Sequence, residues 1–292
     1  MNQDRQWNLL RKATVMFQSI PHRGAVFIGG LMGLLLWGVS KERVDKAEAR
    51  CVRALGIGPT LARDIVRKSY VNHGRCVAEF IRLPIMKEKL SSMVSIHGEH
   101  HLRNAFLRGK GVILLSGHIG NWEIGAAALA MKGYPMNAIG ADQRDSRVTD
   151  MITSIRGACS VKGIGKGFNL KAALSCLRSG EILCILLDQD AKSNGLVLPF
   201  LGLPASTPYG PVKIASKLGA AVVPVFSIRR GGGDKFDLHF LPPLEMPSSI
   251  ASEIDVERST SICNDVISSW IRKHPDQWMW LYPRWSSTLG DR

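Results

Sequence analysis

The stretch VILLSGHIGNWEIGAAALAMKG, residues 112–133, indicates the fold class of this chain. Residues 112–115 form an apolar run typical of a buried strand, and residues 121–132 predict a helix that Gly133 ends. Similar apolar strands are predicted further along the chain, at 136–140, 181–187, 221–229 and 236–241. Helices are predicted around them, at 150–157, 170–178, 207–218 and 252–273. This alternation predicts an α/β fold with a mostly parallel central sheet flanked by helices.

The chain is strongly basic, with 38 Lys and Arg residues against 24 Asp and Glu residues and a formal net charge of +14. This charge favours anionic partners, which include nucleic acid, anionic lipid and an acidic carrier protein. Because the basic residues are spread along the chain, nucleic acid is not expected to be a partner. The six cysteines form no CxxC pair, so we expect neither a zinc site nor a disulfide framework.

The N-terminal segment is unusually apolar. Residues 24–39 (GAVFIGGLMGLLLWGV) carry no charge, and residues 7–20 before them mix apolar and basic side chains. A helix over this run would be about 24 Å long, which is short for a hydrocarbon core of about 30 Å. Three interpretations stay open: a cleaved signal peptide, a buried core helix, or a membrane anchor that spans or only enters the bilayer.

Basic residues on both sides of the run favour the anchor, although they do not determine its orientation. The residue sequence after it, VSKE at 39–42, is a poor cleavage site. We therefore predict a membrane anchor over residues 1–40, amphipathic and then hydrophobic, followed by a single α/β domain over 41–292. Residues 42–109 are predicted to be helical.

His118 is the first candidate catalytic residue, because sites in parallel sheets lie beyond the carboxyl ends of strands. Asn121 is a suitable N-cap for the following helix, which places Glu123 in its first turn. Gly117 and Gly120 permit a bent loop that could bring His118 back toward Glu123. A carboxylate that holds one imidazole nitrogen leaves the other as a general base. The alternative is an ordinary loop histidine beside a helix-start acid.

The motif SGHIGNWE resembles the HxxxxD/E motif of the glycerolipid acyltransferases. It is most similar to the GHxGNWE form of the bacterial lipid A biosynthesis (late) acyltransferases, the lauroyl and myristoyl transferase type. Three further stretches resemble that family: ALSCLRSGEILCILLDQD at 173–190, GLVLPFLGLPASTPYGPVKIASKLGAAVVPVF at 195–226, and HPDQWMWLYPRW at 274–285. The resemblance extends from about residue 40 to residue 286. Pro283 departs from it, since the family often has a basic pair before the final aromatic residue.

The resemblance implies transfer of a fatty acyl chain from the thioester of acyl carrier protein to a hydroxyl of a lipid A precursor. It implies a site on the cytoplasmic face of the bacterial inner membrane. His118 would remove the hydroxyl proton and Glu123 would orient the imidazole, without a metal or another cofactor. A different glycolipid or phospholipid acceptor, a coenzyme A donor, and an inactive lipid-binding protein of the same fold stay open as alternatives. A monomer is favoured.

The remaining candidate residues are assigned to substrate binding. Arg156 is expected at the acceptor phosphate or the thioester oxygen, and Lys162 and Lys166 flank a glycine-rich loop that could hold a phosphate. Asp188 either supports the site or caps a turn. The other candidates are Asn121, Trp122 and Arg284. Trp278, Trp280 and Trp285 are expected either at the lipid interface or in the core, with the core favoured for Trp280.

Overall fold

The computed structural model describes residues 3–140, 143–164, 170–246 and 252–290. Its N-terminal part is helical, as expected, with one exception. The first helices are α1 (Gln3–Ser19), α2 (His22–Val39), α3 (Lys41–Leu55), α4 (Pro59–Met86), α5 (Leu90–Met93) and α6 (Glu99–Phe106). The exception is a short strand between α5 and α6, β1 (Val94–His97), which pairs with a strand near the C-terminus.

A seven-stranded sheet forms the centre of the molecule, in the order β1-β9-β8-β2-β5-β3-β4. The other strands are β2 (Val112–Ser116), β3 (Met136–Ile139), β4 (Lys162–Ile164), β5 (Ile182–Leu186), β8 (Ala221–Arg229) and β9 (Phe236–Phe240). Every neighbouring pair is parallel except β8 and β9. The predicted α/β fold with a mostly parallel sheet is confirmed.

Helices cover both faces of the sheet. Alternate residues of β2 point to opposite faces, so they belong to two different apolar clusters. Ile113 and Leu115 belong to the apolar cluster that includes α9 (Leu170–Arg178), α10 (Gly210–Leu218) and α11 (Glu253–Lys273). Val112 and Leu114 belong to the cluster that includes α7 (Trp122–Met131) and α8 (Ser146–Gly157). These positions agree with the helices expected from the sequence, to within a few residues.

The helix expected over 207–218 begins only at Gly210, because the residues before it form a strand. Residues 203–207 are β7 (Leu203–Thr207), which pairs in an antiparallel hairpin with β6 (Leu196–Phe200). Leu201 and Gly202 make the two-residue loop, and both have positive φ angles, 52° and 86°. A two-residue hairpin turn with both φ values positive matches the twist of the paired strands. Leu201 is a poor sequence signal for such a turn.

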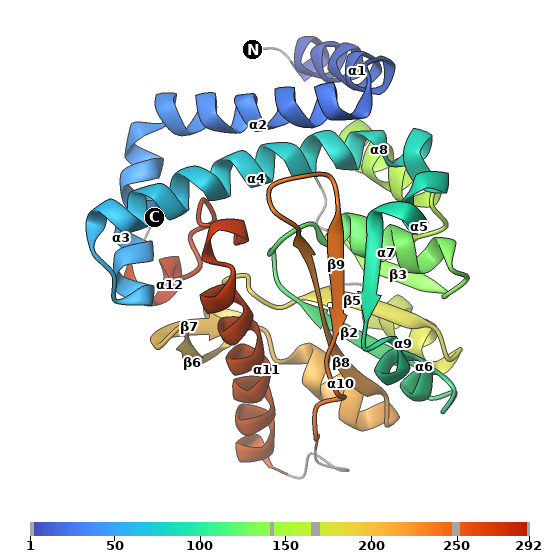
Figure 1. The fold of residues 1–292 in the computed structure, drawn as a ribbon. Helices are drawn as coiled ribbons and strands as arrows, with labels where there is room; N and C mark the ends of the chain where they lie inside the picture. The colour runs from blue at the N-terminus through green and yellow to red at the C-terminus, as the bar shows by residue number, and fades with distance from the viewer. Residues whose placement is uncertain (1–2, 141–142, 165–169, 247–251, 291–292) are drawn as a thin grey trace.

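Helix α2 lies lengthwise along α4 and does not extend away from the domain (Figure 1). Gly29, Gly30 and Gly33 face α4, and a Cβ atom on Gly33 would collide with the carbonyl group of Tyr70. The outward face of α2 is exposed and apolar, comprising Phe27, Leu31, Met32, Leu35, Leu36 and Val39. Among the described residues, α2 is the one helix whose length and composition would suit a membrane span, and 28% of it is buried.

The close approach of α2 to α4 gives the first testable prediction. We expect Gly33→Ala to lower the free energy of unfolding by about 1–3 kcal/mol, because the added methyl group forces the two backbones apart. The matched control is Gly38→Ala in the same helix, where no atom lies within 4 Å of the new Cβ. Chemical unfolding in detergent micelles measures both variants. Equal stabilities would show that α2 is not held against α4.

Candidate active site

The pairing of β2 with β5 brings His118 and Asp188 together. Ser116 lies opposite Leu186 in the parallel register, and His118 and Asp188 each follow two residues later. The Nδ1 atom of His118 lies 2.7 Å from Oδ1 of Asp188. The backbone N–H of His118 donates to the other carboxylate oxygen, also at 2.7 Å. Both residues lie at the carboxyl edge of the sheet, where sites in such folds collect.

The Asp188 carboxylate is buried, with its side chain 2% exposed. The indole Nε1 of Trp278 donates a third hydrogen bond to it, at 2.8 Å. Burial by itself raises the pKa of Asp188, but the charge of His118 and these hydrogen bonds outweigh burial and lower the pKa. An ionised carboxylate only accepts hydrogen bonds, so the proton of a neutral His118 is on Nδ1. The Nε2 atom is therefore left unprotonated and can act as a general base.

The prediction that Glu123 orients the imidazole of His118 is wrong. Glu123 lies in the first turn of α7 and binds Arg156 of α8 instead, with Oε1–Nη2 and Oε2–Nε distances of 2.5 and 3.1 Å. Burial tends to lower the pKa of Arg156, but the Glu123 carboxylate outweighs it and raises the pKa. Of the motif residues, it is the Trp122 ring that packs edge-on against His118, at 4.8 Å between ring centroids. A catalytic role for Glu123 stays a prediction.

A buried ion pair supports the loop that carries His118. Arg229 of β8 makes two hydrogen bonds of 2.6 Å to the carboxylate of Glu79 on α4. The two side chains are 2% and 0% exposed. The same carboxylate accepts a hydrogen bond from the side chain of Asn121 at 2.7 Å, while Asn121 also caps α7 through the N–H of Ile124. Asn121 is 1% exposed, so its predicted contact with substrate is not found, because the side chain is used for capping.

The backbone of Gly120 fixes the same loop from two further directions. Its carbonyl accepts hydrogen bonds from Asn72 at 3.3 Å and from Cys76 at 3.1 Å, both on α4. Its N–H donates to the carbonyl of Gln277 at 3.0 Å. Its φ of +63° and the carbonyl of Ser227, with which a Cβ would collide, both require glycine at this position. The loop is therefore held by α4, β8 and the C-terminal segment.

A small apolar cavity of about 60 Å³ lies beside this loop, between α7 and the sheet. Its apolar wall includes Leu114, Leu129, Met136, Ala138 and Leu238. Its polar wall includes Ser116, Glu123, Arg156 and Cys184, together with Trp122. Burial raises the pKa of the Cys184 thiol to about 12, which makes it a poor nucleophile at neutral pH.

Two other candidate cations are not placed to bind a phosphate in the cavity. Arg284 is buried and 0% exposed, because it donates to the carbonyl of Ser206 at 2.5 Å and to Oγ1 of Thr207 at 2.7 Å. The predicted substrate contact of Arg284 is therefore wrong. Lys162 is exposed on β4 and pairs with Glu181 at 2.9 Å. Lys166 lies outside the described residues.

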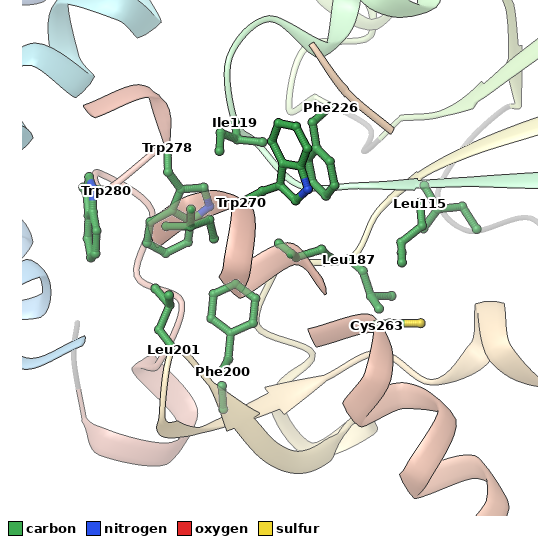
Figure 2. Packing of buried hydrophobic residues seen from close by; sticks show 14 of the residues in the cluster. Leu115, Ile119, Leu187, Phe200, Leu201, Phe226, Cys263, Trp270, Trp278 and Trp280 are labelled. Atoms are coloured by element: carbon green, nitrogen blue, oxygen red, sulfur yellow. The ribbon is translucent and has the colours of Figure 1, made fainter. Parts of the chain in front are cut away.

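Trp278, Trp280 and Trp285 are all buried, which confirms the core position favoured for Trp280. Trp278 and Trp280 belong to the same buried apolar cluster as Phe200 and Leu201, and Figure 2 draws all four residues. The interfacial interpretation of these tryptophans is wrong, because their rings pack on one another and on Phe200.

Sequence reasoning did not find His73, which lies on α4 near His118. Burial and then the charge of His118 lower the pKa of His73 to about 4. His73 is therefore neutral at neutral pH and does not compete with His118 for a proton. The only sequence signal for it was its place in the helix before the motif.

One group within the described residues has donor atoms close enough to share a metal ion: His97, Asp237 and His239, within 4.8 Å of one another. The Asp237 carboxylate already binds Arg230 and His97. The two histidine rings stack at 4.7 Å and 15°, so the lone pairs of their nitrogens run nearly parallel and do not converge. This group lies on β1 and β9 and is not part of the His118 site.

Comparison with known proteins identifies the family of this chain. Residues 6–287 match the sequence model of the family described as bacterial lipid A biosynthesis acyltransferase. The chain belongs to this family. The resemblance seen in the motifs is thereby confirmed, and membership makes the chain an acyltransferase.

Relatives within the family differ in their acceptors. The phosphatidylinositol mannoside acyltransferase of Mycobacterium tuberculosis (strain CDC 1551 / Oshkosh) is 26% identical, over 85% of this chain and 78% of its own. The lipid A biosynthesis lauroyltransferase of Escherichia coli (strain K12) is 25% identical, over 68% and 64%. The solved 1-acyl-sn-glycerophosphate acyltransferase of Thermotoga maritima is more distant, with 14% identity and a TM-score of 0.41 over 86% of this chain and 98% of its own.

The buried ion pair gives the second testable prediction. Arg229→Met leaves the Glu79 carboxylate buried without its cation, so we expect the free energy of unfolding to fall by about 3–5 kcal/mol. The matched control is Lys46→Met, which breaks the exposed Lys46–Glu42 pair and should cost at most about 1 kcal/mol. Urea unfolding followed by tryptophan fluorescence compares the two. Similar losses in both variants would contradict a supporting role for the buried pair.

Proposed function

We propose that this acyltransferase moves a fatty acyl chain from the thioester of acyl carrier protein to a hydroxyl of a lipid A precursor. The observation that carries the proposal is the His118–Asp188 pair beside an apolar cavity. Trp122 contacts the His118 ring and also lines the cavity, so the base and the cavity are adjacent. The cavity follows α7 from Trp122 to Leu129, a length of about 10 Å at 1.5 Å per residue.

The reaction follows from the free nitrogen of His118. Nε2 takes the proton of the acceptor hydroxyl as the oxygen attacks the thioester carbonyl carbon. Asp188 stabilises the imidazolium that forms, as a buried carboxylate does when it holds Nδ1–H. The tetrahedral intermediate collapses, the carbon–sulfur bond breaks, and the thiolate takes the proton back from Nε2. The products are an ester and a free thiol, and no acyl-enzyme forms.

We assign Arg156 and Glu123 to the carbonyl end of the acyl chain. Both line the cavity at the first turn of α7, where the helix dipole favours developing negative charge. The side chains are each 15% exposed, so they meet solvent on one side and the cavity on the other. The ion pair keeps both charges compensated when a chain excludes water from the cavity.

The assignment of the base and its carboxylate is the third testable prediction. We expect Asp188→Asn to lower kcat by about 10³–10⁴-fold, because an amide cannot hold the Nδ1–H tautomer or stabilise the imidazolium. His118→Ala should abolish transfer. Glu123→Gln should cost far less, because its hydrogen-bonding partner is Arg156. Transfer of labelled acyl groups from acyl carrier protein in detergent micelles measures all three, and circular dichroism checks their folds.

The opposite order of effects would contradict this assignment. If Glu123→Gln abolished transfer and Asp188→Asn left it intact, the carboxylate of the HxxxxE motif would be the partner of His118 after all. If His118→Ala stayed active and folded, the base would lie elsewhere.

The acceptor is tested separately, because relatives are named for lipid A and for phosphatidylinositol mannoside. Purified enzyme is given each glycolipid with an acyl carrier protein donor or a coenzyme A donor. Mass spectrometry of lipids from cells with and without the protein gives the mass of the transferred chain. Transfer to phosphatidylinositol mannoside alone would replace the lipid A assignment. Transfer to neither, with no change in cell lipids, would favour an inactive lipid-binding protein.

We further propose that the protein lies on the cytoplasmic face of the bacterial inner membrane, with the outward face of α2 in the lipid interface. Phe27, Leu31 and Leu35 are exposed along that face, and α1 supplies basic residues next to it. A helix with one apolar outer face and its inner face on the protein lies in the plane of a membrane rather than across it.

The fourth prediction tests this surface without removing the helix. We expect the triple variant Phe27→Gln, Leu31→Gln and Leu35→Gln to lose most of its binding to phosphatidylglycerol vesicles, because the apolar area that enters the lipid is gone. The matched control is Leu107→Gln with Ile254→Gln, which removes apolar side chains at two other exposed positions. Vesicle co-sedimentation at high salt measures binding. Retention of the triple variant on the vesicles would place the membrane contact elsewhere.

A further inference from the structure

A basic hollow lies at the corner between α2 and α3, separate from the cavity beside His118. It has a volume of about 490 Å³ and is lined in part by Tyr70 of α4 and by residues of the C-terminal segment. We call it the α3 hollow. Its lining residues are Leu36, Ser40, Glu42, Arg43, Lys46, Arg50, Tyr70, Leu281 and Pro283.

The cations of the α3 hollow lie on one face of a helix. Arg43, Lys46 and Arg50 are three and four residues apart, which aligns them along α3. Glu42 is the one acidic residue among the described residues of the lining, and it pairs with Lys46 at 2.8 Å. Arg43 and Lys46 together outweigh Glu42 by one positive charge. An anion entering the hollow therefore meets a complementary field.

Two of the polar side chains are held rigidly in the wall. Arg50 is 6% exposed and donates to the carbonyl of Trp280 at 2.9 Å. Tyr70 is 2% exposed, and its hydroxyl makes no hydrogen bond within the described part of the chain. Burial raises the pKa of Tyr70 in spite of the Arg50 and Arg43 charges. The hydroxyl therefore keeps its proton and can donate a hydrogen bond to an anion. The hollow is thus a preformed site with an unused donor.

The first turn of α3 adds hydrogen-bond donors to the wall of the hollow. Ser40 is the residue before the helix and lines the hollow, but its side chain makes no capping hydrogen bond. The first N–H groups of a helix have no partner within it, and the dipole favours an anion there. Such helix starts are common binding sites for phosphate groups.

One wall of the α3 hollow is apolar and continues onto the outside of the molecule. Leu36 lines the hollow and also belongs to the exposed face of α2, with Leu35 and Met32 beside it. A ligand with a charged head and an apolar tail would satisfy both parts. The head would lie among the cations and the tail would follow the outward face of α2.

We propose that the α3 hollow binds the phosphate group of an amphiphilic lipid. This inference rests on the proposed function in one respect. The acceptor of the proposed reaction is a phosphorylated glycolipid, and this acceptor would supply the phosphate group that the hollow binds. Of the described cations assigned to substrate binding from the sequence, Arg156 is paired with Glu123, Lys162 is paired with Glu181, and Arg284 is fully buried.

A chain of contacts links the α3 hollow to the catalytic site. Arg50 binds the backbone of Trp280, whose ring packs edge-on against Trp278 at 4.6 Å. Trp278 in turn donates to Asp188.

The test begins with direct binding, which needs no transfer activity. Full-length protein in maltoside micelles is titrated with dodecyl phosphate by calorimetry. We expect Arg43→Gln with Lys46→Gln to bind roughly tenfold more weakly, because charged hydrogen bonds to the phosphate are lost. Tyr70→Phe removes the unused hydroxyl and should also weaken binding. The matched control is Arg53→Gln with Arg108→Gln, which removes the same charge from exposed positions outside the hollow.

A second arm identifies the source of the phosphate. If the acceptor supplies it, the hollow variant raises KM for the phosphorylated acceptor and leaves kcat and the KM for a dephosphorylated acceptor unchanged. If membrane phospholipid supplies it, KM is unchanged and binding to phosphatidylglycerol vesicles falls relative to phosphatidylcholine vesicles. Either result supports the phosphate site.

Equal dodecyl phosphate affinity in the hollow variant, the control and the wild type would overturn the proposal. The result of the dodecyl phosphate titration does not depend on whether the protein transfers acyl chains. A wild-type protein that transfers no acyl chain but binds dodecyl phosphate through Arg43 and Lys46 would refute the reaction and leave the site standing.

Discussion

The carboxylate of Asp188 is the group on which the active site depends. It is buried, and an uncompensated charge in that position would be costly. Its compensation comes from three places: the backbone of His118, the imidazole of the same residue, and the indole of Trp278. The imidazole of His118, the proposed general base, therefore has its full set of supporting contacts only when the C-terminal segment has docked on the sheet. That segment is part of the site although it is distant in sequence.

Helix α4 links this site to the outer surface of the protein. One side of α4 accepts the glycine face of α2, and the other side presents Glu79, Asn72 and Cys76 to the loop around Gly120. Packed helices lie about 8–10 Å apart, and glycine contacts bring them to the close end of that range. The apolar face of α2 and the catalytic loop are thus fixed on opposite sides of a two-helix layer. Insertion of the apolar face of α2 into a lipid interface would therefore fix the distance of His118 from the membrane surface.

Much of this could be predicted from local signals, and the rest depended on contacts between distant segments. Strands β2, β3, β5, β8 and β9, the helices around them and the position of His118 followed from apolar periodicity and from the glycines of the loop, whereas β1, β4, β6 and β7 were not predicted. The partner of His118 did not, because Glu123 is near in sequence whereas Asp188 is near only through the β2–β5 register. Asp188 was recognised at the end of its strand, but strand order is not a local property. The burial of Arg284, Trp278 and Trp285 could not be predicted for the same reason, since burial depends on what packs over a side chain, whereas the core position favoured for Trp280 is confirmed.

The formal charge of +14 does not by itself show where an anion binds, because a paired cation presents little field to solvent. Arg156 and Arg229 each face a carboxylate, and Arg284 is buried against the backbone. On α3, a helix outside the motif stretches, Arg43 and Lys46 together outweigh Glu42 by one positive charge. If the α3 hollow binds the charged head, acyl transfer and head recognition would draw on separate parts of the chain, so that one could change without the other. Such a separation would suit relatives that are named for phosphatidylinositol mannoside and for lipid A.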